Sequence, residues 1–405
     1  MEREARTKVR GKMSDANDHE QLYLPDSDLD DANREFAQAI RSFAAEKLAP
    51  FAREIDEQRT FRREMVDDLG RAGILGGPLP AEVGGGGWTP LQLAIAHEEL
   101  GAACSNARGF CAVQTGLVAQ CLHHNGDESQ RDRWLRPLMR GEAIGAFGLT
   151  EPEAGSDVAS LQTRAERQPD GSYRISGTKH WITNGGVADV LLVFATVDPN
   201  LGAKGLTGFL LTTDREGVQR TPMPGVDLGH RGSDHAVIEL RNVSAEASEV
   251  VGDVGAGFRI AMNGLAAGRL SVAAGAVGIH RRAIAETTAF ARSRRQFGKP
   301  ISRFQMVQER LADMLTALHA SRSLVHRCAR RREAGAETHA DLAMAKLYST
   351  EAAAAAADQA VMLHGGRGYT SAYPAERLWR DVQALRIYEG TSMIQKSIIG
   401  RMLGD

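Results

Sequence analysis

The sequence predicts a multi-domain α+β protein in which a β-rich middle domain separates two helical domains. Apolar residues recur at helical spacing up to about residue 141, short β-rich runs fill residues 145–251, and helical spacing returns after Gly257. With 405 residues and 42% hydrophobic content, the chain can form two or three domains with buried cores. The predicted division is a disordered leader (1–30), an N-terminal α-helical domain (31–144), a middle β domain (145–255) and a C-terminal helical bundle (256–405).

The N-terminal part is predicted to consist of a leader followed by helices. Residues 1–30 are charged and contain no apolar run, so we expect no secretory signal there. From Asp31 onward, Phe36, Ile40 and Phe43 mark one face of a helix. Four successive glycines in PLPAEVGGGGWTP, residues 78–90, do not continue a helix, so we expect a loop of the kind that often lies close to a ligand.

The middle and C-terminal parts differ in their periodicity. The runs YRISG, VLLVFATV, GFLLTT and HAVIEL, separated by Gly, Asp, Asn and Pro, indicate a small antiparallel barrel or sandwich. Farther along, MVQERLADMLTALHASRSLV places Val307, Leu311 and Leu318 on one helical stripe, and residues 352–357 are all strong helix formers. A helical bundle is therefore expected at the C-terminal end.

Composition excludes several classes of function. Lys and Arg number 49 against 51 Asp and Glu, so no overall basic field exists to hold nucleic acid or an anionic membrane. We expect no run long and apolar enough to span a bilayer. Neither a phosphate-binding loop nor a GxGxxG after a strand is present, which argues against nucleotide triphosphatases and Rossmann dehydrogenases. Cys104, Cys111, Cys121 and Cys328 lack metal-ligand spacing and suit a reducing compartment. We expect a cytoplasmic protein without a metal site.

Two stretches of the middle domain combine a strand end with polar or aromatic residues that can bind a ligand. GLTEPEAGSD, residues 148–157, indicates a turn leaving a strand, where main-chain N–H groups and short hydroxyls can reach phosphates and polar ring edges. WITNGG, residues 181–186, places an aromatic face and a hydroxyl at the end of a strand. Such groups can hold a hydride-accepting ring still.

Two stretches of the C-terminal domain add to this pattern. In RRQFGKPISRFQ, residues 294–305, an Arg can pair with a pyrophosphate and a Phe can pack on a ring. HGGRGYTSAYPAERLWRDVQALRIYEGTSMIQ, residues 364–395, has glycines where backbone can approach a cofactor. It also contains one carboxylate, Glu389, next to a Gly-Thr-Ser turn.

In order and spacing, the four stretches resemble the acyl-CoA dehydrogenase flavoprotein family, and the resemblance runs from about Asp31 to the end. It implies that family's fold: an N-terminal α-helical domain, a central antiparallel β-barrel and a C-terminal four-helix bundle. It also implies bound FAD and the α,β-dehydrogenation of a short acyl thioester, carried by CoA or by acyl-carrier protein. Further implications are a homo-oligomer (tetramer or dimer) with FAD at a subunit interface, and electron-transfer flavoprotein as a possible acceptor.

The resemblance also assigns roles to residues. Glu389 is the catalytic base that takes the α-proton while a hydride leaves Cβ for flavin N5. Its main-chain N–H and a flavin ribityl hydroxyl are the donors to the thioester carbonyl. Substrate contacts are expected from Ser156, Arg269 and Gly390. The expected cofactor contacts are Phe147, Leu149, Thr150, Trp181, Ile182, Thr183, Arg294, Gln296, Phe297, Gln305, Met362, Gly365, Gly366, Thr391 and Met393.

The chain departs from the family pattern at several positions. Some members carry the base on an earlier helix, directly before an Arg, but that position here is Gly268, so Glu389 carries the assignment alone. Ala266 stands where CoA-using relatives often have Asp. Met362 replaces a common flavin-contacting Gln, and Met393 replaces an acidic or amide residue. These departures keep a carrier-protein thioester open as the substrate.

The stretch NARGFCAVQTG, residues 106–116, corresponds roughly to the family's acyl-lining helix, where Phe110 and Val113 are expected to limit chain length. Arg108 is predicted to be a surface residue. If its side chain instead faces the pocket, a substrate with a polar or carboxylated acyl group is favoured. Two other functions remain as alternatives. One is a flavin-dependent oxidase or monooxygenase on the same fold, and the other is a non-catalytic, flavin-retaining relative associated with nucleic acid.

Overall fold

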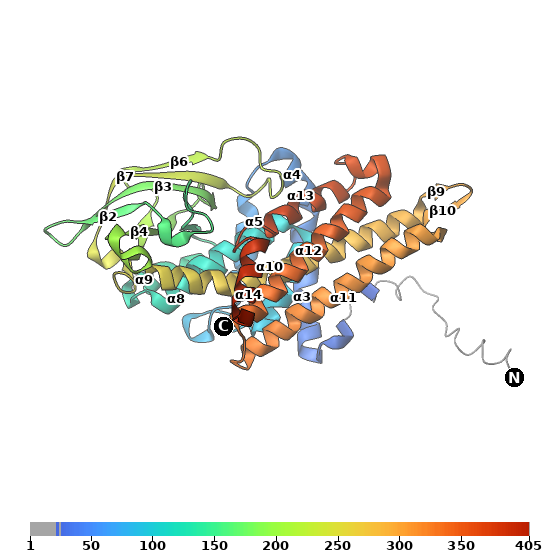
Figure 1. Ribbon diagram of the computed structural model, residues 1–405, viewed down its shortest axis with the longest axis horizontal. Helices are drawn as coiled ribbons and strands as arrows, with labels where there is room; N and C mark the ends of the chain where they lie inside the picture. The colour runs from blue at the N-terminus through green and yellow to red at the C-terminus, as the bar shows by residue number, and fades with distance from the viewer. Residues whose placement is uncertain (1–21, 24–25, 405) are drawn as a thin grey trace.

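The computed structural model describes residues 22–23 and 26–404, in which a β sheet lies at one end of an elongated molecule and long helices form the other end (Figure 1). Most of the predicted leader, residues 1–30, lies outside the described residues. Asp26, near the end of that segment, forms ion pairs with Arg41 and Arg322, at 3.0 and 3.4 Å. The predicted α+β class, with its order of helical, β and helical regions, is confirmed.

The N-terminal helices begin and end at recognisable capping residues. Thr89 and Gln92 form a reciprocal capping box with Pro90 in the first turn of α6, and Gly141, with φ of 70°, ends α9. The glycine-rich segment forms the predicted loop, in which the Gly87 N–H donates to the Leu79 carbonyl at 2.8 Å. The helices are α3 (Asp31–Lys47), α4 (Ala52–Gln58), α5 (Arg63–Arg71), α6 (Pro90–Ala103), α7 (Ser105–Cys111), the π-helix η4 (Ala112–Ala119), α8 (Gln120–Asn125) and α9 (Glu128–Arg140).

The middle domain is one eight-stranded sheet with the order β6-β7-β3-β2-β4-β5-β8, in which β1 pairs with β4. Every residue of β4 is buried, in keeping with its continuous apolar run. The strands are β1 (Gly145–Gly148), β2 (Arg164–Arg167), β3 (Tyr173–Thr183), β4 (Val190–Thr196), β5 (Leu206–Thr212), β6 (Val218–Pro222), β7 (His235–Ala245) and β8 (Val250–Val251).

The sheet differs from the predicted antiparallel barrel in two respects. Strands β1 and β2 pair in parallel with β4, because β3 intervenes in sequence between β2 and β4 and reverses the direction of the chain. Within the described part of the chain, no ladder joins the edge strands β6 and β8. The described ladders therefore combine parallel and antiparallel pairs in one mixed sheet.

The C-terminal domain contains three long helices, and the shorter α13 and α14 pack against α12. A two-stranded hairpin connects α10 to α11 and projects from the end of the bundle distant from the sheet (Figure 1). The elements are α10 (Gly257–Ser293), β9 (Arg295–Gln296), β10 (Lys299–Pro300), α11 (Gln305–Glu333), α12 (His339–His364), α13 (Ala375–Leu385) and α14 (Ser392–Gly404).

Helix α10 is the central helix of the molecule. By length and composition it is apolar enough to cross a membrane, so the expectation that no run meets this test was wrong, but 78% of its most apolar window is buried inside the protein. It packs closely on α6, since a Cβ added at Gly278 would lie 2.1 Å from the Glu98 carbonyl oxygen. The apolar character of α10 is explained by its place in the protein core.

A buried network of ion pairs joins α10 to the neighbouring helices. Arg281 of α10 lies 2.9 Å from Glu98 and also pairs with Glu99, both on α6. Arg322 of α11 and Arg41 of α3 complete the network, at 3.0 Å from Glu98 and 2.9 Å from Glu99. Burial opposes ionisation of Glu98, but Arg322 and Arg281 more than offset this, so the pKa of Glu98 lies below its usual range.

Candidate active site

Glu389 lies in the turn between α13 and α14 and has left-handed backbone geometry, with φ of 56°. This conformation is costly for a residue other than glycine and is found mainly where the surrounding structure enforces it. The turn is braced from α12, because Glu351 accepts a hydrogen bond from Ser392 Oγ and pairs with Arg386 at 2.8 Å. The predicted Gly-Thr-Ser turn thus fixes Glu389 between two helices.

Donors from three helices surround the carbonyl groups of this turn. Gln395 Nε2, on α14, donates to the carbonyls of Glu389 at 3.1 Å and Gly390 at 2.8 Å. Arg269 Nε, on α10, donates to the Glu389 carbonyl at 3.3 Å, and Lys346 Nζ, on α12, donates to the Gly390 carbonyl at 2.7 Å. The structure therefore brings together Glu389, Gly390 and Arg269, as predicted, with Thr391 directly following.

The Glu389 carboxyl group is held in surroundings that disfavour its charge. Its Oε2 atom is buried and has no hydrogen-bond partner among the described residues. Burial raises the pKa of Glu389 to about 7, although Arg269, Lys346 and Arg108 act to lower it. A carboxylate with a pKa in this range exchanges a proton readily near neutral pH.

Gly268 makes room for the Glu389 carboxyl group. A Cβ added at Gly268 would lie 2.8 Å from the Glu389 carboxyl carbon and 2.9 Å from both of its oxygens. The two positions considered for the base, distant in sequence, therefore meet at one place in the structure. Only one of them carries a carboxylate in this chain.

Arg108, on α7, is buried with 1% exposure, so its interpretation as a surface residue was wrong. Gly275 of α10 leaves room for the side chain, since a Cβ there would lie 2.4 Å from Arg108 Cδ. Arg108 Nη2 donates to the hydroxyl of Tyr388, the residue before Glu389. The Nε and Nη1 atoms are buried and have no partner in the described structure. Arg108 thus brings a cation with free donors close to the base.

Two buried histidines next to Arg108 are held neutral. Burial and the Arg108 charge lower the pKa of His97 to about 3 and bring that of His230 well below its ordinary value. His230 Nε2 lies 2.9 Å from Ser105 Oγ. No ion pair joins Arg108 to a carboxylate anywhere in residues 26–404. The guanidinium group therefore has no compensating anion in direct contact.

Phe110 and Val113, the other two residues singled out in the predicted acyl-lining stretch, differ in their burial. Phe110 is 2% exposed and packs on Phe61, with ring centroids 5.9 Å apart. Val113 is half-buried in the π-helix η4 and packs against the core cluster that includes Phe147 and Leu149. A π-helix widens the backbone and often occurs at functional sites. Here it continues the helix that carries Arg108 and packs against β1 of the sheet domain.

The predicted cofactor residues of the sheet domain come together at the ends of β1 and β3. The His180 N–H donates to the Thr150 carbonyl at 2.9 Å, which joins the first stretch to Trp181, Ile182 and Thr183. Trp181 is 57% exposed. Phe147, Leu149 and Ile182 are buried in the core. Ser156 is exposed in the loop after β1.

A second group of predicted residues lies at the opposite end of α10. Arg294 directly follows the last residue of α10. It lies 26 residues after Gly268, which corresponds to about 40 Å along a helix. Phe290 stacks on His364 at 4.2 Å, which brings the end of α12 to the same place. The group comprises Arg294, Gln296, Phe297, Gln305, Met362, Gly365 and Gly366, whereas the exposed Met393 lies near Glu389. Within one chain, these residues are not brought to Glu389.

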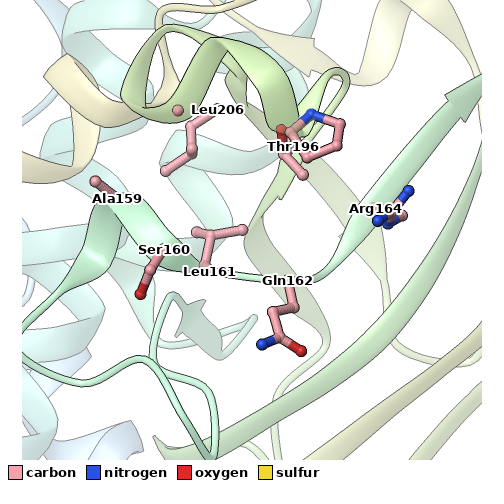
Figure 2. A pocket seen from close by; sticks show the side chains of 9 residues that line it. Ala159, Ser160, Leu161, Gln162, Arg164, Thr196 and Leu206 are labelled. Carbon is pink, nitrogen blue, oxygen red and sulfur yellow. The ribbon is translucent and has the colours of Figure 1, made fainter.

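A cavity of about 280 Å³ lies in the sheet domain (Figure 2). It contains none of the predicted site residues. Its lining residues are Ala159, Ser160, Leu161, Gln162, Arg164, Thr196, Pro199, Gly202 and Leu206. The cavity is therefore separate from the turn that carries Glu389.

Lys346 is the residue of this region that sequence reasoning missed. It is fully buried in α12, at helical spacing from the buried residues Leu342, Ser349 and Ala353. The sequence feature that could have identified Lys346 is its position on the apolar stripe of an alanine-rich helix. Buried lysines are rare unless a partner compensates their charge.

Comparison with known proteins matches most of the described chain to three models of one family. The models match the acyl-CoA dehydrogenase N-terminal domain at residues 30–142, the middle domain at 146–243 and the C-terminal domain at 255–404. A similar curated protein is the short-chain specific acyl-CoA dehydrogenase of Clostridium acetobutylicum, 39% identical over 89% of this chain and 95% of the relative.

Solved structures agree with this result. Butyryl-CoA dehydrogenase from Megasphaera elsdenii is 35% identical, with a TM-score of 0.89 over 93% of this chain and 99% of that one. A glutaryl-CoA dehydrogenase from Mycobacterium smegmatis in complex with FADH2 is 34% identical, with a TM-score of 0.90 over 94% and 97%. The prolyl acyl carrier protein oxidase AnaB is 31% identical, with a TM-score of 0.88 over 93% and 100%.

Proposed function

Because the chain belongs to the acyl-CoA dehydrogenase family, FAD-dependent oxidoreductases that act on CH–CH bonds of acyl thioesters, we propose that its substrate is a short acyl thioester ending in a carboxylate. Glu389 is the base that takes the α-proton, and Arg108 binds the distal carboxylate. The observation that carries the proposal is the buried Arg108 guanidinium, which has free donors next to the base.

The residues at the ends of β1 and β3 fit a flavin. Trp181 presents a large, mostly exposed aromatic side chain, and Thr183 and Thr150 add hydroxyl groups. The main-chain N–H of Trp181 donates a hydrogen bond to Met223 Sδ at 3.3 Å, which helps to fix the position of this residue. These residues hold the ring, and bound FAD supplies the acceptor for the substrate hydride.

Glu389 performs the proton transfer in this proposal. Its pKa of about 7 leaves a substantial fraction ionised at neutral pH, and a base of this strength is better matched to an α-proton than an ordinary carboxylate. The thioester carbonyl accepts a hydrogen bond from the Glu389 main-chain N–H, which stabilises the enolate-like charge. Arg269 lies beside the same turn and contributes positive charge.

Arg108 sets the acyl group that fits. An arginine buried without an anion is costly, and a carboxylate can satisfy two guanidinium nitrogens at once. The neighbouring His97 and His230 are neutral, so they add no positive charge that would compete with Arg108 for a carboxylate. Arg108 donates to Tyr388, directly before the base, so only a short acyl chain separates the α-carbon from Arg108. A cationic group at this place, such as a prolyl ring nitrogen, is disfavoured by the same charge.

The thioester carrier is proposed to be CoA, with acyl-carrier protein as the second candidate. The similarity to AnaB and the loss of an acidic residue at Ala266 support the carrier protein. The Clostridium and Megasphaera relatives support CoA. A titration that includes both carriers distinguishes them.

Assembly into a homo-oligomer completes the proposal. Phe297 at the tip of the β9-β10 hairpin is 93% exposed, and Tyr369 at the same end of the bundle is 87% exposed. Large exposed apolar residues of this kind mark surfaces that a partner covers. We propose that this end, with Arg294 and Gln296, contacts the FAD of a neighbouring subunit in a cytoplasmic dimer or tetramer, and that electron-transfer flavoprotein is the acceptor.

The test of the substrate class is an anaerobic titration of the FAD-loaded protein with glutaryl-CoA, butyryl-CoA and their carrier-protein thioesters, following the oxidised flavin band. We expect the glutaryl thioester to bleach the band at lower concentration than the butyryl thioester. Arg108→Ala should weaken the glutaryl response at least about 30-fold, since truncating one partner of a buried charge pair costs roughly 2 kcal/mol or more.

Arg108→Lys, which keeps the charge, is the matched control and should retain part of the preference. The butyryl response of Arg108→Ala should stay close to that of the unmodified protein. Equal loss with both thioesters, or no preference in the unmodified protein, would show that Arg108 does not select a carboxylate. Anaerobic bleaching that reverses rapidly when air is admitted would favour the oxidase or monooxygenase alternative, because oxygen would then be re-oxidising the reduced flavin.

Gly268→Ala tests the space around the base. The added Cβ would lie 2.8 Å from the Glu389 carboxyl carbon, so the carboxylate has to move. We expect FAD binding and folding to be retained and the rate of flavin reduction to fall up to about 100-fold, because small displacements of a catalytic group are costly. Gly264→Ala, one helical turn away on α10, meets only the Cys121 sulfur and a Leu117 methyl carbon and serves as the comparison. Equal rates in the two variants would contradict the expectation.

A further inference from the structure

Lys346 has no role in the proposed chemistry, yet its side chain is fully buried against the turn that carries the base. Its Nζ donates to the Gly390 carbonyl at 2.7 Å. We propose that Lys346 is a positioning residue, which holds the Glu389–Gly390 turn in place and presents a cation to the Glu389 carboxylate. The inference rests on the proposed role of Glu389 as the base.

The hydrogen bonds explain the positioning part of this role. Glu389 has a positive φ of 56°, which is costly for a residue other than glycine and is held by contacts outside the turn, whereas glycine readily adopts the φ of 89° found at Gly390. Gln395 reaches both carbonyl groups from α14, and Arg269 reaches one from α10. Lys346 is the donor from α12, the helix that also braces the turn through Glu351. The turn is therefore fixed from three helices at once.

An amide side chain could also donate a hydrogen bond to the Gly390 carbonyl, but it would carry no charge. The second part of the proposed role is therefore the positive charge of Lys346. No carboxylate lies within 4.0 Å of its Nζ in the described chain. Burial lowers the pKa of Lys346 to about 8; Glu389 and Glu351 raise it, while Arg269 and Arg386 lower it. The ammonium group therefore keeps its proton at neutral pH and acts on Glu389.

The groups around Glu389 define what Lys346 adds. The cations that lower the pKa of Glu389 are Arg269, Lys346 and Arg108. Its other titratable neighbours are uncharged at neutral pH, since burial raises the pKa of both Tyr388 and Cys121 to about 12. Burial raises the pKa of Glu389, and the Lys346 charge counters this effect. Removing that charge should therefore raise the pKa further, so that Glu389 ionises at higher pH.

The experiment measures the rate of anaerobic flavin reduction against pH in the FAD-loaded protein, with Lys346→Met, Lys346→Gln and Lys346→Arg. Lys346→Met should reduce flavin more slowly, and its pH midpoint should lie about one unit higher, a tenfold loss of rate at pH values below the midpoint. Lys346→Gln keeps a hydrogen-bond donor, so its rate at high pH should recover while its midpoint stays raised. Lys346→Arg should restore the midpoint.

Lys47→Met, the same change at an exposed residue of α3, controls for loss of a positive charge. If Lys346→Met does not retain FAD, the Gln variant alone decides the inference. If Lys346→Gln has the pH midpoint of the unmodified protein, the proposed effect of the Lys346 charge on Glu389 is wrong. If Lys346→Met has both the rate and the midpoint of the unmodified protein, the whole inference is wrong. Reduction that survives Glu389→Gln would instead overturn the assignment of the base, so the two failures are distinguishable.

Discussion

Glu389→Gln is expected to keep FAD bound and to lose flavin reduction by acyl thioesters, with a fall in rate of about 10²- to 10⁴-fold, the usual contribution of a general base. The amide has nearly the same shape as the carboxyl group, so the turn, with its hydrogen bonds from Gln395 and Lys346, is preserved. What is lost is the ability to accept the α-proton. Stopped-flow absorbance of the flavin band measures the rate, and the visible spectrum measures bound FAD.

The pH dependence of the unmodified protein tests the same assignment. Burial raises the pKa of Glu389 to about 7, and the base acts only when ionised, so the reduction rate should rise with pH through about 7 and fall below it. The Gln variant should show no such rise. Glu35→Gln, at an exposed carboxylate of α3, is the control. A Glu389→Gln variant that keeps most of its rate would exclude Glu389 as the base.

The largest effect on stability is expected from Arg281→Met. This substitution leaves Glu98 and Glu99 buried with one cation fewer, and breaking a buried ion pair from one side typically costs about 3–5 kcal/mol. The free energy of unfolding, from urea titrations followed by circular dichroism, should fall by that amount. Arg282→Met is the matched control, because the neighbouring Arg282 pairs with Glu286 at the surface, where such a pair contributes about 0–1 kcal/mol.

The network also predicts how stability varies with pH. The pKa of Glu98 is lowered in the folded protein, so its ionisation stabilises the fold above the ordinary pKa of a glutamate, and this contribution is lost as pH falls below that value. In Arg281→Met the loss on acidification should be smaller, because less favourable charge interaction remains to be lost. Equal free energies of unfolding for Arg281→Met and Arg282→Met would contradict the role of the network.

The sequence predicted those features that local patterns determine. Helical spacing located the two helical regions, and four β-rich runs located β3, β4, β5 and β7, because side-chain periodicity follows directly from backbone geometry. The runs did not include β1, β2, β6 or β8. The parallel pairing of β1 with β4 was not predictable in this way, since it joins segments about 45 residues apart. Glu389 was found by motif resemblance, and its raised pKa follows from burial that only the folded chain provides.

Arg108 and Lys346 show why the rest of the site required the structure. Arg108 is buried because Gly275, on another helix, leaves room for it, and no pattern within residues 106–116 contains that information. Lys346 lies on the buried face of α12, but its partner is a main-chain carbonyl more than forty residues later. Residues of this kind are recognised by their neighbours in space.

The contact between Gly268 and Glu389 has a consequence for the history of such enzymes. A carboxylate borne by α10 at position 268 and one borne by the turn at 389 reach the same space, so the base is defined by location and either segment can supply it. The exchange requires two reciprocal substitutions, and each of the two orders passes through an intermediate that has either two crowded carboxylates or none. Any exchange of the segment that carries the base in this fold therefore has to pass through one of these two intermediates.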